Sequence, residues 1–355
     1  VRIIRNDLLV EIPTRSNRIL ILDEVTYIKD WDKGIKFLAD SGEFENVVLV
    51  LTGSDSVIIQ ETRKRFPGRR GKAKLVDFHL NPLSFRQVVH LRDSQTGSFL
   101  DSTKDDAINL PQPIQDKVEL FFQDYIKHGG FLTAINDLVG NGKILPATMN
   151  TYADWVRGDI LKRNKSEERL REVLQAVCTR LATQVTWNNL AADLSIDHPA
   201  TVASYIELLA SLDVVFIQPA LLEDKLKAAP KKPKKLHFRD PFICRAIHRW
   251  LNAENPQAAP LQDATLVEGI VATHISRLWP TFYIKATGEV DLAIVRGNRF
   301  EPLEVKWGNH TRPKDLKQIA KYENGVIWRK QKSEALINGV PCKYLPLALY
   351  RFMGE

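Results

Sequence analysis

The sequence predicts an α/β protein built from several domains, and four observations lead to this expectation. Its 355 residues exceed what one hydrophobic core usually holds. A β-α-β pattern opens the chain, a helix-turn-helix pattern lies in the middle, and strands alternate with helices again after Leu266. We therefore expect domains at residues 1–90, 91–165, 166–250 and 256–355.

The composition agrees with a globular chain rather than a membrane protein. The hydrophobic content is 44%, and no apolar run approaches the roughly 18 to 20 residues that a membrane span needs. Cys178, Cys244 and Cys342 are far apart, which favours neither a disulfide framework nor a zinc site and predicts a reducing, cytoplasmic compartment. The net charge of +7 is compatible with nucleic-acid binding. Val1 is not a methionine and no signal-peptide pattern follows it, so we expect a fragment, or a chain numbered from an internal point.

Two apolar runs near the N-terminus predict neighbouring parallel strands. Residues 18–25 (RILILDEV) and 47–53 (VVLVLTG) are nearly continuous in apolar side chains, as buried strands are. Between them, residues 31–39 place apolar side chains at helical spacing. We expect part of a parallel sheet here, with a further strand at residues 74–80.

Two acidic residues, Asp23 and Glu24, end the first of these strands. This is the Walker B arrangement, in which the first carboxylate helps to hold Mg²⁺ and the second orients or activates water. The alternative is that the acids only cap the next helix. The segment Thr52-Gly53-Ser54 places polar side chains at the end of the second strand, where a sensor of the γ-phosphate would lie.

The phosphate-binding loop that such a domain needs is absent from residues 1–17. The motif is GxxxxGK[ST], and neither Gly71-Lys72 nor Gly142-Lys143 completes it, because Phe66 and Asp137 stand where its first glycine is required. The chain by itself is therefore not expected to hydrolyse ATP.

The middle of the chain is predicted to be helical. A helical lid is expected after Pro82, interrupted by a polar loop at residues 93–106. Further on, Thr186 is placed as the N-cap of the second of three helices, in a helix-turn-helix pattern followed by two strands that could form a wing. The helices are expected at 167–182, 188–194 and 200–212, and the strands at 214–218 and 234–238.

This helix-turn-helix region predicts contacts with DNA. The last helix could present Thr201, Ser204 and Tyr205 to DNA, and a basic run could contact phosphates. Two alternatives stay open, a winged helix that serves only for packing and a lysine run that forms a flexible loop. The lysines concerned are Lys231, Lys232, Lys234 and Lys235.

A predicted hairpin near residue 297 gathers charged side chains. If Gly297 and Asn298 form a two-residue turn of type I′ or II′, the numbers of opposed residues sum to 595. Asp291 then faces Glu304, and Glu289 faces Lys306. Strand alternation places these four side chains on one sheet face, with apolar residues on the other.

Two opposed carboxylates repel each other unless water or a cation separates them. Mg²⁺, which prefers oxygen ligands, would resolve the repulsion between Asp291 and Glu304, and Lys306 could orient a nucleophilic water or offset phosphate charge. Glu268 on the preceding helix could supply another carboxylate, and Gln318 on a following helix could contact metal-bound water or phosphate. A solvated amphipathic hairpin, or a domain that binds DNA without cutting it, are the alternatives.

Several of these segments resemble a known family. The segments RILILDEVTYIKDWDKGIKFLADSG, VLTGSDS, FPGRRGKAKLVDFHLNPLSF, YIKHGGFLTAIND and KKPKKLHFRDP resemble prokaryotic, chiefly archaeal, AAA-like P-loop ATPases with an uncharacterised C-terminal domain of nuclease type. The resemblance covers most of the chain. It implies ATP binding, with Asp23 and Glu24 at Walker B and Ser54 as sensor. Arg69 or Arg70 could contact phosphate, although two adjacent arginines before a strand more often form a solvated turn.

The hairpin has its own resemblance. An aspartate, a following E-x-K and an upstream helical glutamate resemble the PD-(D/E)xK nuclease superfamily. We therefore expect an ATP-regulated, DNA-acting protein with ATP and Mg²⁺ as cofactors and a nuclease-like C-terminal domain. The alternative is a non-cutting signalling or scaffold ATPase whose C-terminal domain recognises DNA or a protein. The sequence leaves a homo-oligomer open.

Overall fold

The computed structural model describes residues 2–9, 18–53, 76–104, 107–196, 198–255, 257–308, 316–332 and 335–354. It has a mixed α/β fold with parallel strands, as predicted. The chain forms two units, residues 1–80 with 211–213 and residues 81–210 with 214–355. Each unit is described by itself below.

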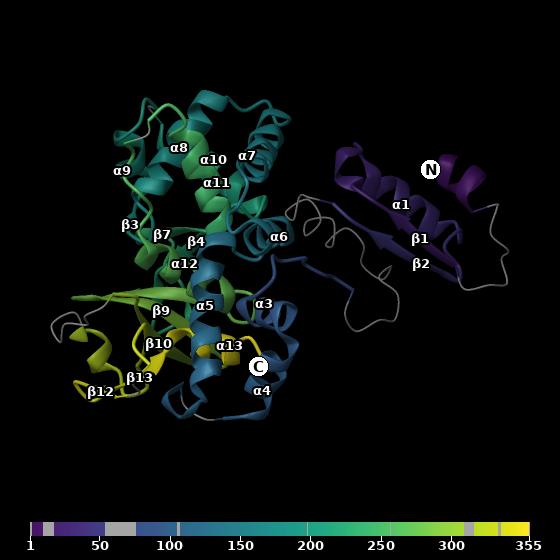
Figure 1. The fold of residues 1–355 in the computed structure, drawn as a ribbon. Coiled ribbons are helices and arrows are strands. Elements are labelled where there is room, and N and C mark those ends of the chain that lie inside the picture. The colour runs from purple at the N-terminus through teal and green to yellow at the C-terminus, as the bar shows by residue number, and fades with distance from the viewer. Residues whose placement is uncertain are drawn as a thin grey trace. The chain divides into compact units, whose positions relative to one another are not determined.

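The first unit contains the predicted β-α-β element (Figure 1). Strand β1 (Arg18–Leu22) pairs in parallel with β2 (Val47–Leu51), and α1 (Trp31–Asp40) connects them. Leu20 of β1 is buried, as are Ile35 and Leu38 of α1. The apolar periodicity therefore predicted both the elements and the face that they bury.

The other face of these two strands is exposed. Ile19 and Ile21 are 64% and 63% exposed, and Val48 is 59% exposed. Strands of a parallel sheet are normally covered on both faces. The two strands therefore have the residue types of a fully covered sheet, while one of their faces remains open.

The strand expected at residues 74–80 does not form in its described part. Residues 76–80 have no regular structure, and Phe78 and Leu80 are 82% and 99% exposed. Residues 74 and 75 lie outside the described residues. The apolar alternation was not sufficient here, since a strand needs a neighbour that accepts its backbone hydrogen bonds.

The second unit begins with helices, as predicted for the region after Pro82. One expectation was wrong, because residues 93–106 are not only a loop but include α4 (Ser94–Ser102). The Asp93 side chain accepts the backbone N–H of Thr96 at 2.9 Å and so caps α4, while Leu100 buries its apolar side. The other helices are α3 (Phe85–Arg92), α5 (Gln112–His128), α6 (Leu132–Asn141) and α7 (Pro146–Leu161).

The helix-turn-helix pattern produced the predicted elements. Thr186 caps α9, its hydroxyl accepting the N–H of Asn189 at 3.1 Å. The helices are α8 (Glu167–Thr179), α9 (Trp187–Ala192) and α10 (Pro199–Ser211). In the described residues the strands β3 (Gln184–Val185), β7 (Lys234–Phe238) and β4 (Val215–Pro219) form an antiparallel sheet in that order. A small hairpin, β5 (Leu221–Leu222) with β6 (Lys227–Ala228), lies between β4 and β7 in sequence.

The C-terminal part is a mixed sheet flanked by helices. In the described residues its strand order is β12-β13-β11-β10-β9-β8. The helix expected at residues 314–321 appears as a 3-10 turn, η5 (Ile319–Lys321), while 309–315 lie outside the described residues. The elements are α11 (Pro241–Leu251), α12 (Asp263–Ile275), β8 (Thr281–Lys285), β9 (Glu289–Arg296), β10 (Arg299–Lys306), β11 (Val326–Arg329), β12 (Leu336–Ile337), β13 (Val340–Tyr344) and α13 (Leu345–Phe352).

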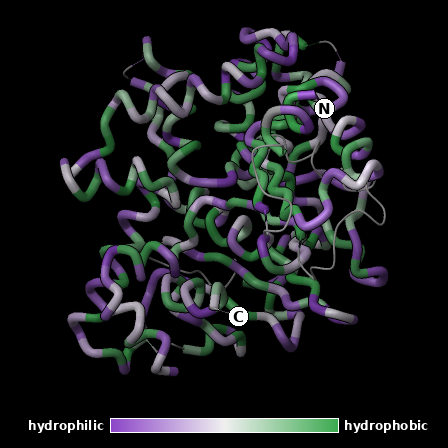
Figure 2. The backbone as a smooth tube through the Cα atoms, turned by 90° about the vertical axis from the view of Figure 1, so that its right-hand side faces the viewer, coloured by the Kyte–Doolittle hydropathy of each residue, from purple (hydrophilic) through white to green (hydrophobic). Residues whose placement is uncertain are grey.

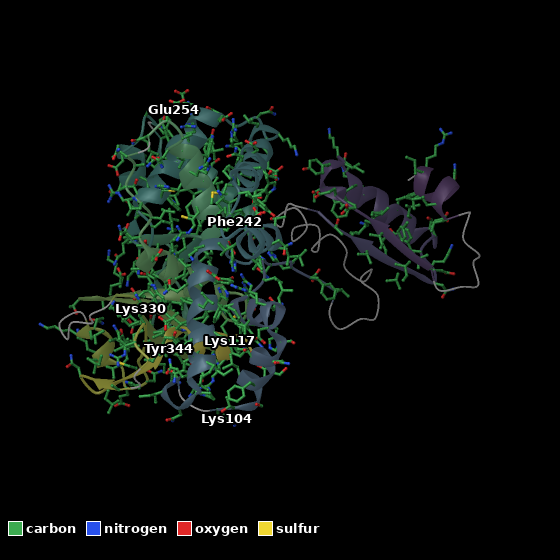
Figure 3. All side chains as sticks on the ribbon, in the orientation of Figure 1. Lys104, Lys117, Phe242, Glu254, Lys330 and Tyr344 are labelled. Carbon is green, nitrogen blue, oxygen red and sulfur yellow. The ribbon has the colours of Figure 1, made fainter. Side chains whose placement is uncertain are left out.

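Hydrophobic and hydrophilic stretches alternate along the chain, as elements with one buried face require (Figure 2). Phe242 of α11 has no exposed surface, whereas Glu254 after the same helix is exposed at the rim (Figure 3). Among the described residues, no helix combines the length and apolar character needed to cross a membrane.

Candidate carboxylate and lysine centre

The hairpin has the predicted register. Arg296 pairs with Arg299 and Leu292 with Leu303, so opposed residue numbers sum to 595. Gly297 adopts a φ of +61°, which the first position of either predicted turn type requires and which glycine adopts without strain. The turn therefore determines that Asp291 and Glu304 come next to each other across the strands.

Around Asp291 and Glu304, side-chain carboxylates accept backbone N–H groups of the opposite strand. The Asp291 carboxylate accepts the N–H of Val305 at 2.9 Å, and the Glu304 carboxylate accepts the N–H of Asp291 at 3.4 Å. From the other side, the Gln218 amide of β4 donates to the carbonyl oxygen of Asp291 at 2.9 Å. Asp291 and Glu304 are 8% and 4% exposed, so these contacts are buried.

Two ammonium groups lie among the carboxylates. Lys306 Nζ is 2.6 Å from Glu304 Oε1 and 3.9 Å from Asp291 Oδ2. Lys235 Nζ is 2.7 Å from Glu268 Oε1 and 3.3 Å from Asp291 Oδ1. Lys235 also pairs with Glu289. The structure therefore brings Glu268, Asp291, Glu304 and Lys306 together, as the sequence predicted, and adds two residues that were not assigned to the centre.

Lys235 corrects an expectation. It was expected to contact DNA phosphates from the tip of a wing, but it has no exposed surface. Lys235 lies on β7, the middle strand of the three-stranded sheet, and its side chain points to the carboxylates of the C-terminal domain. A lysine in a basic run carries no sign of this in sequence, because burial depends on the neighbouring sheet.

The ionisation of the centre follows from its burial and its charges. Burial raises the pKa of Glu268 to about 8, and the negative charge of Asp291 contributes to the rise. Burial and the Asp291 charge likewise raise the pKa of Glu304 to about 8. Burial alone would raise the pKa of Asp291, but Lys235 and Lys306 hold it below its ordinary value. Glu268 and Glu304 therefore keep protons at neutral pH, because the two ammonium groups would not offset the charge of all the carboxylates gathered here.

The carboxylates of the centre are suitable ligands for a hard divalent cation, but three of them contact Lys235 in this structure. The acidic side chains that converge here supply carboxylate oxygens, which are the ligands that Mg²⁺ prefers. Within the described ranges, no three His, Cys, Asp or Glu side chains are placed to hold a metal ion as they stand. The ammonium group of Lys235 lies between Glu268, Glu289 and Asp291. A metal ion would need the side chains around Lys235 to rearrange.

Gln318 forms hydrogen bonds with the turn that precedes β9. Its Oε1 accepts the N–H of Gly288 at 3.2 Å and the hydroxyl of Thr287 at 3.3 Å. These two residues immediately precede β9, which carries Glu289 and Asp291. The predicted contact of Gln318 with metal-bound water or phosphate stays a prediction, and its observed contacts position the start of the strand.

Three more residues of the centre were missed from sequence. Gln184 of β3 donates to the carboxylate of Glu289. Gln218 also contacts His237, whose Nε2 lies 2.8 Å from Gln218 Oε1. Burial, with the positive charge of Lys235, lowers the pKa of His237 to about 3, so this histidine is neutral. Glutamines with ordinary sequence neighbours gave no signal for these roles.

The residues expected to contact DNA differ in exposure. The prediction for Tyr205 is wrong, because it is 2% exposed and its hydroxyl accepts the N–H of Ser166 at 2.9 Å. Ser204 accepts a hydrogen bond from Lys165 at 2.7 Å, and Thr201 is half-buried. In the basic run, Lys231 is exposed, Lys232 donates to the carbonyl of Lys285 at 3.1 Å, and Lys234 donates to that of Pro230 at 3.3 Å.

The Walker-type acids of the first unit lie at the predicted strand end. Asp23 and Glu24 are exposed after β1, and the Thr52 hydroxyl at the end of β2 donates to Asp23 and accepts the N–H of Glu24 at 3.1 Å. Glu24 adopts a φ of +53°, which is uncommon for a residue with a side chain. Thr52 thus joins the two strand ends. Ser54, Arg69 and Arg70 lie outside the described residues.

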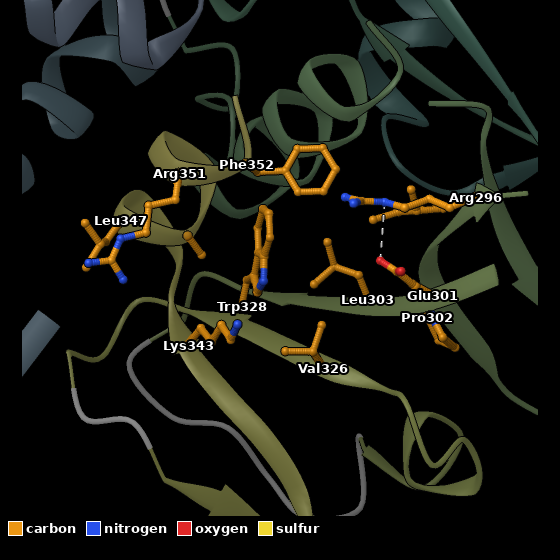
Figure 4. Close-up of a pocket in the computed structure, with 12 residues that line it drawn as sticks. Arg296, Glu301, Pro302, Leu303, Val326, Trp328, Lys343, Leu347, Arg351 and Phe352 are labelled. Carbon is orange, nitrogen blue, oxygen red and sulfur yellow. Dashed lines mark ion pairs between the residues drawn. The ribbon is translucent and has the colours of Figure 1, made fainter. Parts of the chain in front are cut away.

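A cavity of about 250 Å³ lies elsewhere in the C-terminal domain, between the sheet and α13 (Figure 4). Trp328 and Phe352 line it together with Arg296, whose guanidinium lies 3.5 Å from Glu301. Arg296 and Glu301 alternate along their strands with Asp291 and Glu304, so the cavity opens on the other face of the sheet. It is separate from the carboxylate and lysine centre.

Comparisons with known proteins match two parts of the chain. Residues 2–89 match the family model of an AAA domain, and residues 120–255 match a domain of unknown function, DUF8612. A search of curated proteins gave no match. Among solved structures, the Walker-type ATPase PABY2304 of Pyrococcus abyssi is 14% identical, with a TM-score of 0.39 over 65% of this chain, which spans 63% of that one. By the family model, the first part of the chain is similar to AAA domains.

Proposed function

We propose that this chain belongs to an ATP-binding, DNA-acting protein with a Mg²⁺-dependent nuclease centre in its C-terminal domain. One observation carries the proposal. Asp291, Glu304 and Lys306 converge in a buried hairpin with Glu268 of α12 nearby through their shared lysine contacts. Burying several acids together is costly, and a chain that does so has placed them for binding or chemistry.

In the proposed centre the carboxylates are ligands of the metal ion, and the amine of Lys306 lies beside them. Asp291 and Glu304 would hold the ion, with Glu268 as a further ligand when its carboxylate is released from Lys235. A bound Mg²⁺ supplies Lewis-acid stabilisation of a phosphate and a more acidic water. Lys306, already 2.6 Å from Glu304, would orient a water molecule or offset charge on a phosphate. Gln318 would keep β9 in place through its turn.

The nucleotide-binding part of the proposal rests on the first unit. Residues 2–89 match an AAA domain, and Asp23 and Glu24 lie beside Thr52 at the end of parallel strands. We propose Asp23 as a Mg²⁺ ligand and Glu24 as the residue that orients water, with Ser54 and Arg69 or Arg70 near the phosphates. A phosphate-binding loop must come from outside residues 1–17. The exposed apolar face of β1 and β2 fits a covering layer of helices, which parallel sheets normally have on both faces.

DNA binding is proposed for the helix-turn-helix region. In chain order the elements are α8, β3, α9, α10, β4 and β7, with the three strands in one sheet, which is the order of a winged helix. Because Tyr205 and Lys235 are buried, the side chains proposed to contact DNA are Thr201, Ser204 and the exposed Lys231. Lys232 and Lys234 would contact phosphate only after leaving their carbonyl partners.

Metal-dependent DNA cleavage tests the central proposal. Purified protein is incubated with single-stranded, double-stranded and branched DNA in Mg²⁺ or Mn²⁺. Cleavage is expected for the wild type and is expected to fall at least about 100-fold in Asp291→Ala and Glu304→Ala, as for removal of ligands that act as a unit. Glu301→Gln, on the same strand but the other sheet face, is the matched control and should cleave normally. Circular dichroism confirms that each variant is folded.

A non-cutting signalling or scaffold ATPase is the second candidate. The lysine-filled arrangement favours it, since in the part of the chain that is described no metal-holding group is preformed. Absence of cleavage on every DNA form, together with DNA or protein binding that survives Asp291→Ala, would support this function and reject the nuclease.

A further inference from the structure

Lys235 forms ion pairs with three carboxylates of the centre, and it comes from another part of the fold. It lies on β7 within the segment matched by DUF8612, whereas its three carboxylate partners, Glu268, Glu289 and Asp291, belong to the C-terminal domain beyond it. A buried ammonium group is costly unless it is paired and hydrogen-bonded. The two parts therefore meet in a contact that neither can satisfy alone.

The ammonium group takes the place that a cation would take. Its nitrogen lies 2.7 Å from Glu268 Oε1 and 3.3 Å from Asp291 Oδ1, and it has three N–H donors for three carboxylates. An Mg²⁺ ion binds the same type of oxygen at about 2.0–2.1 Å. A divalent ion on these same oxygens would lie close to the ammonium group, and the repulsion between the two charges in a buried site would weaken ion binding.

Lys306 contacts other oxygens than Lys235 does, and it leaves Glu268 and Asp291 Oδ1 open. It contacts Glu304 Oε1 at 2.6 Å and is 3.9 Å from the other oxygen of Asp291, Oδ2. Withdrawal of Lys235 would free Glu268 and Asp291 Oδ1 while Lys306 kept its place beside Glu304. The two lysines therefore have different consequences for ion binding.

The position of Lys235 depends on how β7 and β4 are attached to the edge strand β8. The hydroxyl of Tyr283 donates to the carbonyl of Pro233 at 2.6 Å, and Lys232 donates to the carbonyl of Lys285 at 3.1 Å. Gln218 of β4 donates to the carbonyl of Phe282 at 2.9 Å. Together with the bridge between Ala220 and Tyr283, these hydrogen bonds hold β4 and β7 against β8, so Lys235 would move only together with its strand.

From this geometry we infer that Lys235 is an internal cation that competes with the divalent ion for Glu268 and Asp291. The inference rests on the proposed metal centre and deepens it. While β7 is attached as observed, Lys235 holds the carboxylates and disfavours the ion. Movement of the three-stranded sheet away from β8 withdraws Lys235 and permits the ion to bind. The helix-turn-helix region would thereby control the nuclease-like centre.

Titration with Mn²⁺, followed by electron paramagnetic resonance, tests this inference without relying on activity. The full chain is compared as wild type, Lys235→Met and Lys234→Met. Lys234→Met is the matched control. Lys234 is next to Lys235 on the same strand, but it contacts Pro230 and the Trp187 ring rather than the carboxylates. Lys235→Met is expected to bind Mn²⁺ about tenfold or more tightly than wild type because a competing charge is gone. Lys234→Met is expected to bind like wild type.

The outcomes separate the inference from the proposed function. Equal Mn²⁺ affinity in all three proteins would overturn the role of Lys235 while leaving the metal centre intact. Absence of Mn²⁺ binding in both folded wild type and folded Lys235→Met would overturn the metal centre and the inference with it.

A measurement on the wild type covers the case in which Lys235→Met does not fold. Reductive methylation of lysines is followed by peptide mass spectrometry with and without Mn²⁺. Lys235 has no exposed surface and should be protected without the ion, then become labelled when the ion displaces it. The exposed Lys231 should be labelled equally in both conditions. Binding of Mn²⁺ with Lys235 still protected would contradict the inference.

Discussion

The molecule carries two pairs of an aspartate and a glutamate, and the surroundings of the two pairs differ. Asp23 and Glu24 end a parallel strand, are exposed, and contact the hydroxyl and backbone of a strand-end threonine. Asp291 and Glu304 lie in a hairpin, are almost completely buried, and are surrounded by ammonium groups. Acidic side chains therefore acquire strongly shifted pKa values only through burial and through the charges that other segments bring to them.

The two acidic pairs should differ most in the free energy of unfolding that is lost when a contact partner or member is removed, and the largest loss is expected for Lys235. Lys235→Met leaves three carboxylates without their shared partner, and the free energy of unfolding should fall by about 3–5 kcal/mol at neutral pH, as for other broken buried pairs. Asp23→Ala in the exposed pair should change it by no more than about 0.5 kcal/mol. Denaturant unfolding followed by circular dichroism measures both. Similar values for the two variants would remove the distinction between the pairs.

The pH dependence of stability should also distinguish the buried pair. Glu268 and Glu304 have ordinary pKa values of 4.5 and values of about 8 in the fold, where Lys235, Lys306, Glu289 and Asp291 face them. The folded state therefore holds protons that the unfolded state has lost. This contribution is complete below pH 4.5 and is lost as the pH rises through about 8.

With chelator present, the free energy of unfolding should accordingly decrease between about pH 5 and pH 8. Glu304→Gln should flatten this decrease, and Glu301→Gln on the opposite sheet face should not. Denaturant titrations across this range measure the slope. A stability that rises with pH in the wild type would show that the carboxyls are not held in the protonated form.

A smaller effect is expected at the turn that positions Asp291. A Cβ added at Gly288 would lie 3.0 Å from the Cβ of Gln318, so Gly288→Ala should cost about 1–3 kcal/mol through crowding. Gly140→Ala is the control, since no atom lies within 4 Å and the site is in a helix. It should stabilise the protein by about 0.5–1 kcal/mol. Thermal unfolding compares the two, and an unchanged midpoint for Gly288→Ala would remove the bracing role of Gln318.

The smallest effect is expected at the exposed pair. Thr52→Val removes the hydroxyl that joins Asp23 to the second strand, and should cost about 0.5–1.5 kcal/mol in the first unit. Thr183→Val, which removes a local hydroxyl contact in the second unit, serves as the control and should leave the first unit unchanged. Hydrogen exchange of the β1 and β2 amides measures the change locally. Unchanged exchange there would show that Thr52 does not join the strands.

Local pattern predicted the elements and the hairpin from sequence. The apolar runs around Asp23 gave the parallel strands, Thr186 marked a helix start, and Gly297 with Asn298 set the register that opposes Asp291 and Glu304. Each of these depends on side-chain period, capping or turn conformation, which neighbouring residues determine. Polar sequence misled at α4, where the Asp93 cap and buried Leu100 outweighed composition.

Tertiary structure alone decided which polar side chains belong to the centre. Lys235 and Lys231 are four residues apart in one basic run, yet one is buried among carboxylates and the other is exposed. Tyr205 became a buried anchor for Ser166 rather than a surface contact. Burial and ion pairing depend on segments distant in sequence that pack against a residue, and a local pattern does not contain that information.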